Sequence, residues 1–329
     1  MLREPGRCNV EFWSEKSMRF ARSFHLVVSS AIAAACMSDA LASTSTTDRI
    51  DAPTAKPLYQ MQPVEAGRYI AWEHGHEPDV RKRIAAIARK NIGQPYRLNL
   101  LGEFPYQVHD ELPMFSLDHS DCTVFVEHTY AMALSRSWDE FFWMLQRIRY
   151  RDGIIGVATR NHYTELDWNA ANRWLVTDMS AQFAGPDGQS YMMTVDRTTF
   201  LKTHHHIDVD IPVESSRQAY VPKARAVALV GRLDEGDYIN VVSLLVDGTT
   251  MVTHVGLVVL GENGERHFLH SSDPAVREET LSSFIARTEA REERNRQAGK
   301  KGSTLLGFKF LHLNDHIVVP PMAPQPRPW

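Results

Sequence analysis

The spacing of hydrophobic positions after residue 77 predicts helices first. Apolar residues recur every three or four positions from Asp79 to Ile92, as they do in an amphipathic helix. Residues 122–134 have almost no polar face, so they predict a buried central helix, and the N-cap formers Asp118, Ser120 and Asp121 precede them. A capping-box sequence at 137–140 predicts a second helix that runs to about Arg149 and packs on the first.

The final third of the chain has the shorter period of strands. Turn signals at Asp247–Gly248 and Asn263–Gly264 separate β-branched or alternating runs at 238–245, 251–260, 265–271 and 307–313. The charged segment 277–301 between the last two runs is expected to be helical. Helices followed by an antiparallel sheet indicate an α+β domain.

Three other segments lack such periodicity. Residues 43–77 are rich in Ser, Thr, Pro and Asp and are interpreted as a linker or N-terminal arm. Within the domain, expected at 78–316, residues 150–233 form an inserted segment, of which 166–233 carries no recognisable motif. Residues 317–329 form a Pro-rich tail.

The first 42 residues have the pattern of an export signal. Met18 to Arg22 is a basic region, Leu26 to Ala35 an apolar core, and Ala40-Leu41-Ala42 a small-x-small cleavage site. The biological start is therefore expected at Met18, and the mature protein in the periplasm. The apolar core is about half the roughly 20 residues that a membrane span needs. Anchoring as a lipoprotein through Cys36 is a minor alternative.

Composition and cysteine count narrow the function. The chain is 43% hydrophobic and 23% charged with a net charge of −4, which is globular and gives no electrostatic reason to expect nucleic-acid binding. Cleavage after Ala42 would remove Cys8 and Cys36 and leave Cys122 as the only cysteine. A lone cysteine of this kind is either a small buried hydrophobic residue or a thiol with a chemical function.

Cys122 stands where a thiol becomes a nucleophile. At the first turn of a helix, the backbone N–H groups and the helix dipole favour thiolate over thiol. Such a nucleophile needs a base. His254 lies within an apolar strand and His270 on the next strand, so the hairpin between them would deliver a base and a residue that orients it. The alternative is two structural histidines.

A cluster of hydrogen-bonding and aromatic side chains occupies Arg160, Asn161, His162 and Tyr163. These residue types suit sugar and amide contacts, and a surface loop with no such role is the alternative. The run His204-His205-His206 is not expected to bind a metal, because three consecutive side chains rarely converge on one ion. No metal or other cofactor is predicted.

The motifs Gly93-Gln94-Pro95-Tyr96, Asp121-Cys122-Thr123, His254-Val255-Gly256 and His270-Ser271-Ser272, in this order, resemble those of papain-like NlpC-type cell-wall hydrolases. More narrowly, residues 121–127 together with 159–163 resemble the N-acetylmuramoyl-L-alanine amidase-like branch. The resemblance covers about 80–315. Thr123 stands where a Ser is commoner, and the gap between Tyr96 and Cys122 is longer than in compact members.

The resemblance implies a papain-like fold in which a helix bearing the catalytic Cys packs on an antiparallel sheet bearing the His residues. It implies Cys122 as nucleophile, His254 as general base and His270 as the polar third member, with Tyr96 and Asp121 near the substrate. The expected function is an exported amidase that cuts the bond between MurNAc and L-Ala of peptidoglycan. An endopeptidase that cuts between D-Glu and the diamino acid, and a non-catalytic peptidoglycan-binding protein, are the alternatives.

Overall fold

The structure, a computed structural model, describes residues 56–328. The predicted leader lies outside the described residues, with its start at Met18 and with Cys8 and Cys36, and so do residues 43–55 of the predicted linker. In the described part of the chain, no helix is both long and apolar enough to cross a membrane.

The described chain begins with a group of helices, and its strands follow, some separated by helices and some consecutive. The α-helices of residues 56–328 are α1 (Pro63–His76), α2 (Val80–Arg89), α3 (Cys122–Ala133), α4 (Trp138–Arg149), α5 (Asn169–Ala171), α6 (Ser180–Ala184), α7 (Arg197–His205), α8 (Lys223–Leu229) and α9 (Leu281–Gln297). The strands are β1 (Val176–Asp178), β2 (Gln189–Val195), β3 (Glu214–Pro222), β4 (Tyr238–Leu244), β5 (Thr250–Leu260), β6 (Arg266–Ser272), β7 (Ala275–Thr280) and β8 (Thr304–Leu313).

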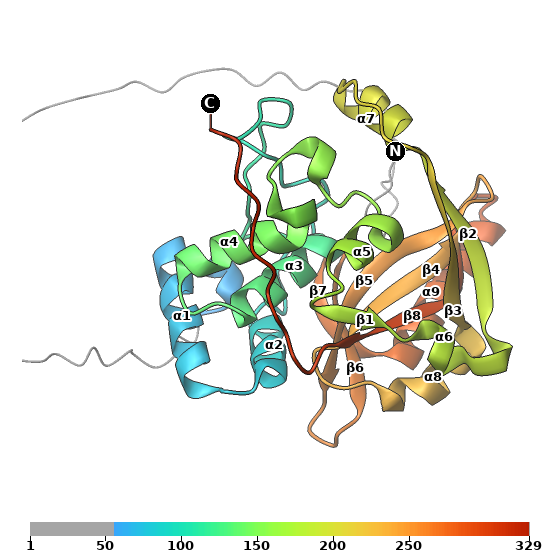
Figure 1. Cartoon of the computed structure of the whole chain (residues 1–329). Helices are drawn as coiled ribbons and strands as arrows, with labels where there is room; N and C mark the ends of the chain where they lie inside the picture. The colour runs from blue at the N-terminus through green and yellow to red at the C-terminus, as the bar shows by residue number, and fades with distance from the viewer. Residues whose placement is uncertain (1–55, 329) are drawn as a thin grey trace, which may run out of the picture.

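The strands form one antiparallel sheet in the order β2-β3-β8-β4-β5-β6-β7, and β1 also pairs with β8. Figure 1 shows α1 to α4 grouped to one side of this sheet, with α8 and α9 lying elsewhere along it. The α+β class and the antiparallel sheet predicted from the sequence are thus confirmed.

Each face of the sheet has its own hydrophobic core. The first cluster joins α1 to α4 to one face of the sheet and contains Cys122, Tyr130, Val255 and Leu269. The second cluster joins α8 and α9 to the other face through an aromatic group that includes Phe268, Phe284, Phe308 and Phe310. Neighbouring residues of a strand can belong to different clusters, because successive side chains point to opposite faces.

Helix α3 is the central helix that its sequence predicted. All twelve of its residues are buried, and the Asp121 side chain caps it by accepting a hydrogen bond from the Val124 N–H at 2.8 Å. The Tyr130 hydroxyl donates to the Gly236 carbonyl at 2.8 Å. The helix packs against β5 and β6 and presents its first turn near the end of β6.

The prediction of a linker or arm is wrong for residues 58–76. Gln62 and Glu65 form a capping box with Pro63 at the start of α1, and Tyr69 and Ile70 are buried in the first cluster. The helix lacks a clear apolar stripe in the sequence because glycines interrupt it. A Cβ added to Gly67 would lie 3.1 Å from the Cβ of Trp138, so the glycine permits close packing on α4.

The inserted segment and the tail both belong to the folded body. Residues 166–233 contain the β2–β3 pair, which extends the sheet beyond β8. In the tail, the Gln325 side-chain amide donates to the Gly153 carbonyl at 2.8 Å, and Arg147 of α4 donates to the Pro320 carbonyl at 3.3 Å. Figure 1 shows this carboxy-terminal segment running past α4.

Candidate active site

The loop before Cys122 is tied to the strand that carries His270. The Ser120 hydroxyl lies 3.0 Å from the Ser271 hydroxyl and 2.7 Å from Gln94 Oε1, and the Ser271 hydroxyl donates to the Ser120 carbonyl at 2.9 Å. All three side chains are buried. These contacts hold the start of α3 against the end of β6, so the segment bearing Cys122 and that bearing His270 are neighbours.

Tyr96 belongs to the same neighbourhood. It forms a β-bridge with Ser120, and its backbone N–H donates to the Pro274 carbonyl at 2.9 Å. Its half-buried ring packs on the first hydrophobic cluster. Three of the four motifs that were separate in the sequence therefore meet around the first turn of α3.

The first turn of α3 is a closed environment. The exposed fractions of Cys122, Asp121 and Thr123 are 0%, 6% and 6%. The Thr123 hydroxyl lies 3.9 Å from Cys122 Sγ. Burial raises the pKa of the Asp121 carboxyl, against the hydrogen bond that it accepts from Val124. Cys122 is disulfide-bonded in this structure, so chemistry at its sulfur requires the thiol form.

His254 and His270 form the pair predicted from the hairpin. The backbone pairs of β5 and β6 run from Leu260–Arg266 to Leu257–Leu269, and the histidines follow on the open side of that last pair. Their rings are perpendicular, and His254 Nε2 lies 2.8 Å from His270 Nδ1. A Cβ on Gly256 would lie 2.7 Å from His270 Cβ, so this glycine lets the two strands approach.

The imidazoles lie on the aromatic face of the sheet. The His270 ring stacks on Phe268, and the His254 ring is parallel to Phe284. Cys122 belongs to the cluster on the other face, with Val255 and Leu269, the sequence neighbours of the two histidines. A direct contact between His254 and Cys122 stays a prediction.

Burial keeps both histidines neutral. It lowers the pKa of His254 well below 6.5, assisted by His270 and three arginines, Arg287, Arg291 and Arg277. It lowers the pKa of His270 to about 4, although Glu279 opposes the shift. A neutral imidazole carries the lone pair that a general base needs at pH 7.

The buried histidines predict a pH-dependent stability. His128 on α3 donates from Nδ1 to the Val124 carbonyl, accepts at Nε2 from the Ser116 N–H, and has a pKa lowered by burial to about 3. In the unfolded chain, the His128 imidazole takes up a proton near pH 6.5. The contribution of neutral His128 to the stability of the folded protein is therefore complete above that pH and is lost as the pH falls toward 3.

His128→Gln should therefore be less stable than the wild type at pH 7, and the difference should shrink by about 2 kcal/mol between pH 7 and pH 5. Urea unfolding of both proteins at several pH values measures this. The comparison also cancels the buried carboxyls Asp121 and Glu127, whose raised pKa values act in the opposite direction. A difference that does not change with pH would contradict the assignment.

The four side chains predicted to bind sugar have contacts inside the protein. Arg160 donates from Nε to Glu103 Oε1 at 2.7 Å and from a terminal nitrogen to Asp110 at 2.8 Å. Asn161 donates to the Ile148 carbonyl at 3.0 Å. His162 Nε2 lies 2.7 Å from the Val157 carbonyl oxygen, while the half-buried Tyr163 ring meets Phe200. Of the four, the first three have evident structural partners.

Arg160→Met should destabilise the protein by about 3–5 kcal/mol, because it leaves a buried carboxylate without its counter-charge. Glu103 is fully buried, and its other partner is the Tyr150 hydroxyl at 2.9 Å. Denaturant unfolding gives the measurement. The double variant Glu103→Gln/Arg160→Met should recover part of the loss, and equal stability of Arg160→Met and the wild type would contradict a structural role.

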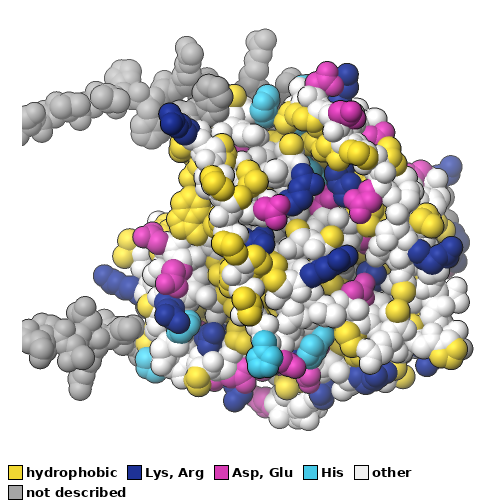
Figure 2. Space-filling view, viewed as in Figure 1, with side chains coloured by type: hydrophobic (Ala, Val, Ile, Leu, Met, Phe, Trp, Pro, Cys, Tyr) yellow, Lys and Arg dark blue, Asp and Glu magenta, His cyan; other side chains and the backbone are white. Residues whose placement is uncertain are grey.

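No group of three His, Cys, Asp or Glu side chains in residues 56–328 is arranged to hold a metal ion. His204 and His205 are at the end of α7, where both rings meet Phe200. Figure 2 shows acidic and basic side chains interspersed over the visible face, without an extended region of one sign.

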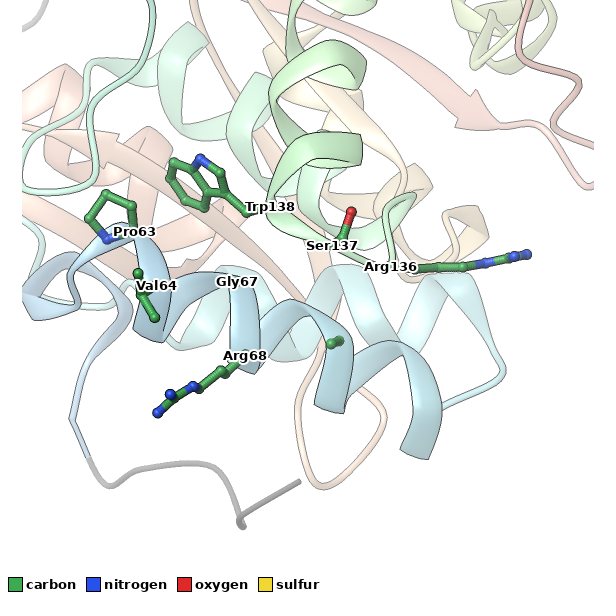
Figure 3. Close-up of a pocket in the computed structure, with 8 residues that line it drawn as sticks. Pro63, Val64, Gly67, Arg68, Arg136, Ser137 and Trp138 are labelled. Atoms are coloured by element: carbon green, nitrogen blue, oxygen red, sulfur yellow. The ribbon is translucent and has the colours of Figure 1, made fainter. Parts of the chain in front are cut away.

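A groove of about 380 Å³ that is not lined by Cys122 or the histidine pair lies between α1 and the start of α4 (Figure 3). Its lining consists of Pro63, Val64, Gly67, Arg68, Ala71, Arg136, Ser137 and Trp138. None of these is a predicted site residue. The Ser137 hydroxyl accepts the Glu140 N–H as the cap of α4, so the groove offers no nucleophile–base pair.

With this geometry established, sequence comparison identifies the family. The profile of the AmiA-like family, described as N-acetylmuramoyl-L-alanine amidase-like, matches residues 86–289, which is more than half of the chain. The chain belongs to this family. No curated protein matches it.

Solved structures share the fold. A Legionella pneumophila protein of the DUF1460 family superimposes with a TM-score of 0.62 at 19% identity, over 78% of this chain and 96% of its own. An N-acetylmuramoyl-L-alanine amidase from Bacteroides uniformis gives 0.54 at 21% identity, over 72% and 99%. A putative xylanase from Bacteroides fragilis gives 0.52 at 23% identity, over 70% and 100%.

Proposed function

We propose that this protein is an exported cysteine amidase that hydrolyses the amide bond between MurNAc and L-Ala in peptidoglycan. Membership of the amidase-like family supports the substrate class. The observation that carries the chemistry is the junction of Ser120 with Ser271, which brings the loop before Cys122 to the strand of His270. A His254–His270 pair at 2.8 Å supplies a base and its orienting group.

The reaction has two halves. The Cys122 thiolate attacks the amide carbonyl of the lactyl group, a C–S bond forms, and the backbone N–H at the start of α3 is the candidate donor to the oxyanion. His254 takes the proton of the Cys122 thiol as the thiolate forms, and the C–N bond then breaks as the protonated His254 gives this proton to the amine of L-Ala. In the second half, His254 takes a proton from water, the resulting hydroxide cleaves the thioester, and the lactyl carboxylate leaves.

This chemistry requires Cys122 as a thiol, and the predicted leader offers a route to it. Both other cysteines, Cys8 and Cys36, precede the predicted cleavage site after Ala42. Processing during export would leave Cys122 as the only cysteine of the mature chain. We therefore propose the periplasm as the place of action, where peptidoglycan is also found.

Contacts with the sugar are proposed for the segment that ends in Tyr163. Its ring is half-buried, whereas Arg160 and Asn161 donate to partners inside the protein. Aromatic faces bind sugar rings well. Tyr96, with its half-buried ring beside Ser120, is proposed to contact the peptide next to the scissile bond, and Asp121 and Thr123 to shape the first turn of α3 that receives it.

Mass spectrometry of muropeptides digested by the processed protein tests the bond that is cut. We expect sugar fragments with a free lactyl carboxylate and intact stem peptides that begin with L-Ala. Disaccharides that retain only L-Ala-D-Glu would replace the proposal with the endopeptidase. Binding without any product, together with a Cys122 thiol inert to iodoacetamide, would indicate a non-catalytic peptidoglycan-binding protein.

A further inference from the structure

The histidine pair continues into a third side chain that the sequence did not single out. Glu279 on β7 has Oε1 2.9 Å from His270 Nε2. The same oxygen accepts a hydrogen bond from Arg287 on α9. The side chains thus form a line, Arg287–Glu279–His270–His254, that runs from α9 across three adjacent strands.

Counting donors along this line fixes where each proton lies. The hydrogen bonds from His270 and Arg287 outweigh burial and lower the pKa of Glu279 to about 2, so its carboxylate only accepts. His270 must then carry its proton on Nε2, and as a neutral ring it accepts at Nδ1. His254 must therefore donate from Nε2, which leaves the lone pair of His254 on Nδ1.

The remaining nitrogen is the one available for chemistry. His254 Nδ1 has no hydrogen-bond partner within residues 56–328, and 7% of the residue is exposed. In the opposite tautomer, His254 Nε2 would carry the lone pair and would accept a hydrogen bond from His270. That lone pair would then not be available to the substrate. The direction of the hydrogen bonds therefore decides whether His254 can act as a base toward the substrate.

Packing holds the line in one geometry. Phe268 stacks on His270 with ring centroids 4.6 Å apart, and Phe284 covers His254 at 5.9 Å with the planes 8° apart. The charged groups with the largest effects on His254 and His270 are Arg277 from β7, Arg287 and Arg291 from α9, and the acid Glu279. Without Glu279, three positive charges would oppose any proton gained by His254.

We infer that Glu279 is a positioning residue: through His270 it fixes the tautomer of His254 so that Nδ1 carries the reactive lone pair, and its charge supports the imidazolium formed during turnover. The catalytic part of this inference rests on the proposed amidase function. The tautomer does not, because it follows from the hydrogen bonds alone.

Nitrogen NMR of the protein labelled with ¹⁵N-histidine tests the tautomer directly. At pH 7 we expect a pyridine-like Nδ1 and a pyrrole-like Nε2 for His254, with His270 protonated on Nε2. Glu279→Ala should convert these signals to a mixture of tautomers. A pyridine-like Nε2 on His254 in the wild type, or unchanged signals in Glu279→Ala, would overturn the inference whatever the activity.

Two variants separate the charge from the hydrogen bond. Glu279→Gln keeps an oxygen that can accept from His270 and Arg287 but removes the charge, so it should keep the tautomer and lower kcat/KM about 10-fold. Glu279→Ala loses both and should fall about 100-fold, with a changed pH profile of kcat rather than a changed KM. Wild-type kinetics in both variants would refute the positioning role.

Glu278→Gln is the matched control. Glu278 is the adjacent residue of β7, and it also binds a histidine and an arginine, His267 at 2.8 Å and Arg89 at 2.9 Å, away from the site. It should leave the His254 signals and hydrolysis unchanged. If the wild-type tautomer is as expected but no muropeptide is cut, the proposed function fails and the line of hydrogen bonds stands.

Discussion

Cys122→Ser should reduce muropeptide hydrolysis by at least about 1,000-fold, because a serine hydroxyl is a poor nucleophile for a base tuned to a thiol. In the proposed mechanism, the first turn of α3 supplies this tuning. Its N–H groups and dipole stabilise a thiolate, whereas a hydroxyl with a much higher pKa stays protonated. The exchange is small, so the buried helix should retain its packing. Release of stem peptides by the processed protein, followed by mass spectrometry, measures the loss.

The control for this variant is structural. Thermal unfolding should show that Cys122→Ser keeps a cooperative transition, and binding to muropeptides should persist. Turnover by Cys122→Ser close to that of the wild type would remove Cys122 from the mechanism.

The sequence predicted best the elements with a strong period of their own. Helices α3 and α4 and strands β4, β5, β6 and β8 lie within a few residues of their predicted bounds. The sequence-based prediction failed for elements whose formation depends on tertiary contacts. Helix α1 has two internal glycines and only a weak apolar stripe, and it is stable because Tyr69 and Ile70 are buried against its neighbours.

The β2–β3 pair was missed for a different reason. β2 alternates with Tyr191, Met193 and Val195 buried, which is a usable strand signal. Its partner β3 begins 19 residues after β2 ends, beyond α7, so no short turn indicated that the two strands pair. Long-range pairing of this kind leaves no local pattern.

The candidate site was likewise predictable only where a local sequence pattern connects its residues. The His254–His270 pair was predictable because one short hairpin joins its strands. Glu279 was not, because it lay in a charged segment, 277–301, that was expected to be helical throughout. The structure instead begins that segment on β7, where His270 pairs with Arg277 and Phe268 with Glu279. Val276 is the only strongly apolar residue of this strand, so its sequence shows no alternation of apolar and polar positions.

Hydrogen bonds inside the protein weaken the prediction that residues 160–163 bind sugar. Hydrogen-bonding residue types at 160–163 suggested ligand contacts, yet the same donors satisfy buried acceptors such as Glu103 and the Ile148 carbonyl. Sequence cannot distinguish these uses, because both require the same chemical groups. Burial of the partner decides between them.

His254→Ala should cost about as much as loss of the nucleophile, whereas His270→Ala should cost only about 10- to 1,000-fold. In the proposed mechanism, His254 is both the proton acceptor for Cys122 and the donor to the leaving amine. Members of one catalytic unit are not additive, so removing His254 alone removes both roles. His270 touches His254 at 2.8 Å and is fully buried behind it, so its loss leaves a base that is present but poorly oriented. Steady-state kinetics on one muropeptide gives both values.

Since His270→Ala also opens a cavity beside Phe268, His270→Gln is the better-packed companion, and it should retain more activity than alanine. Equal tolerance of substitutions at both positions would refute the assignment of base and orienting residue.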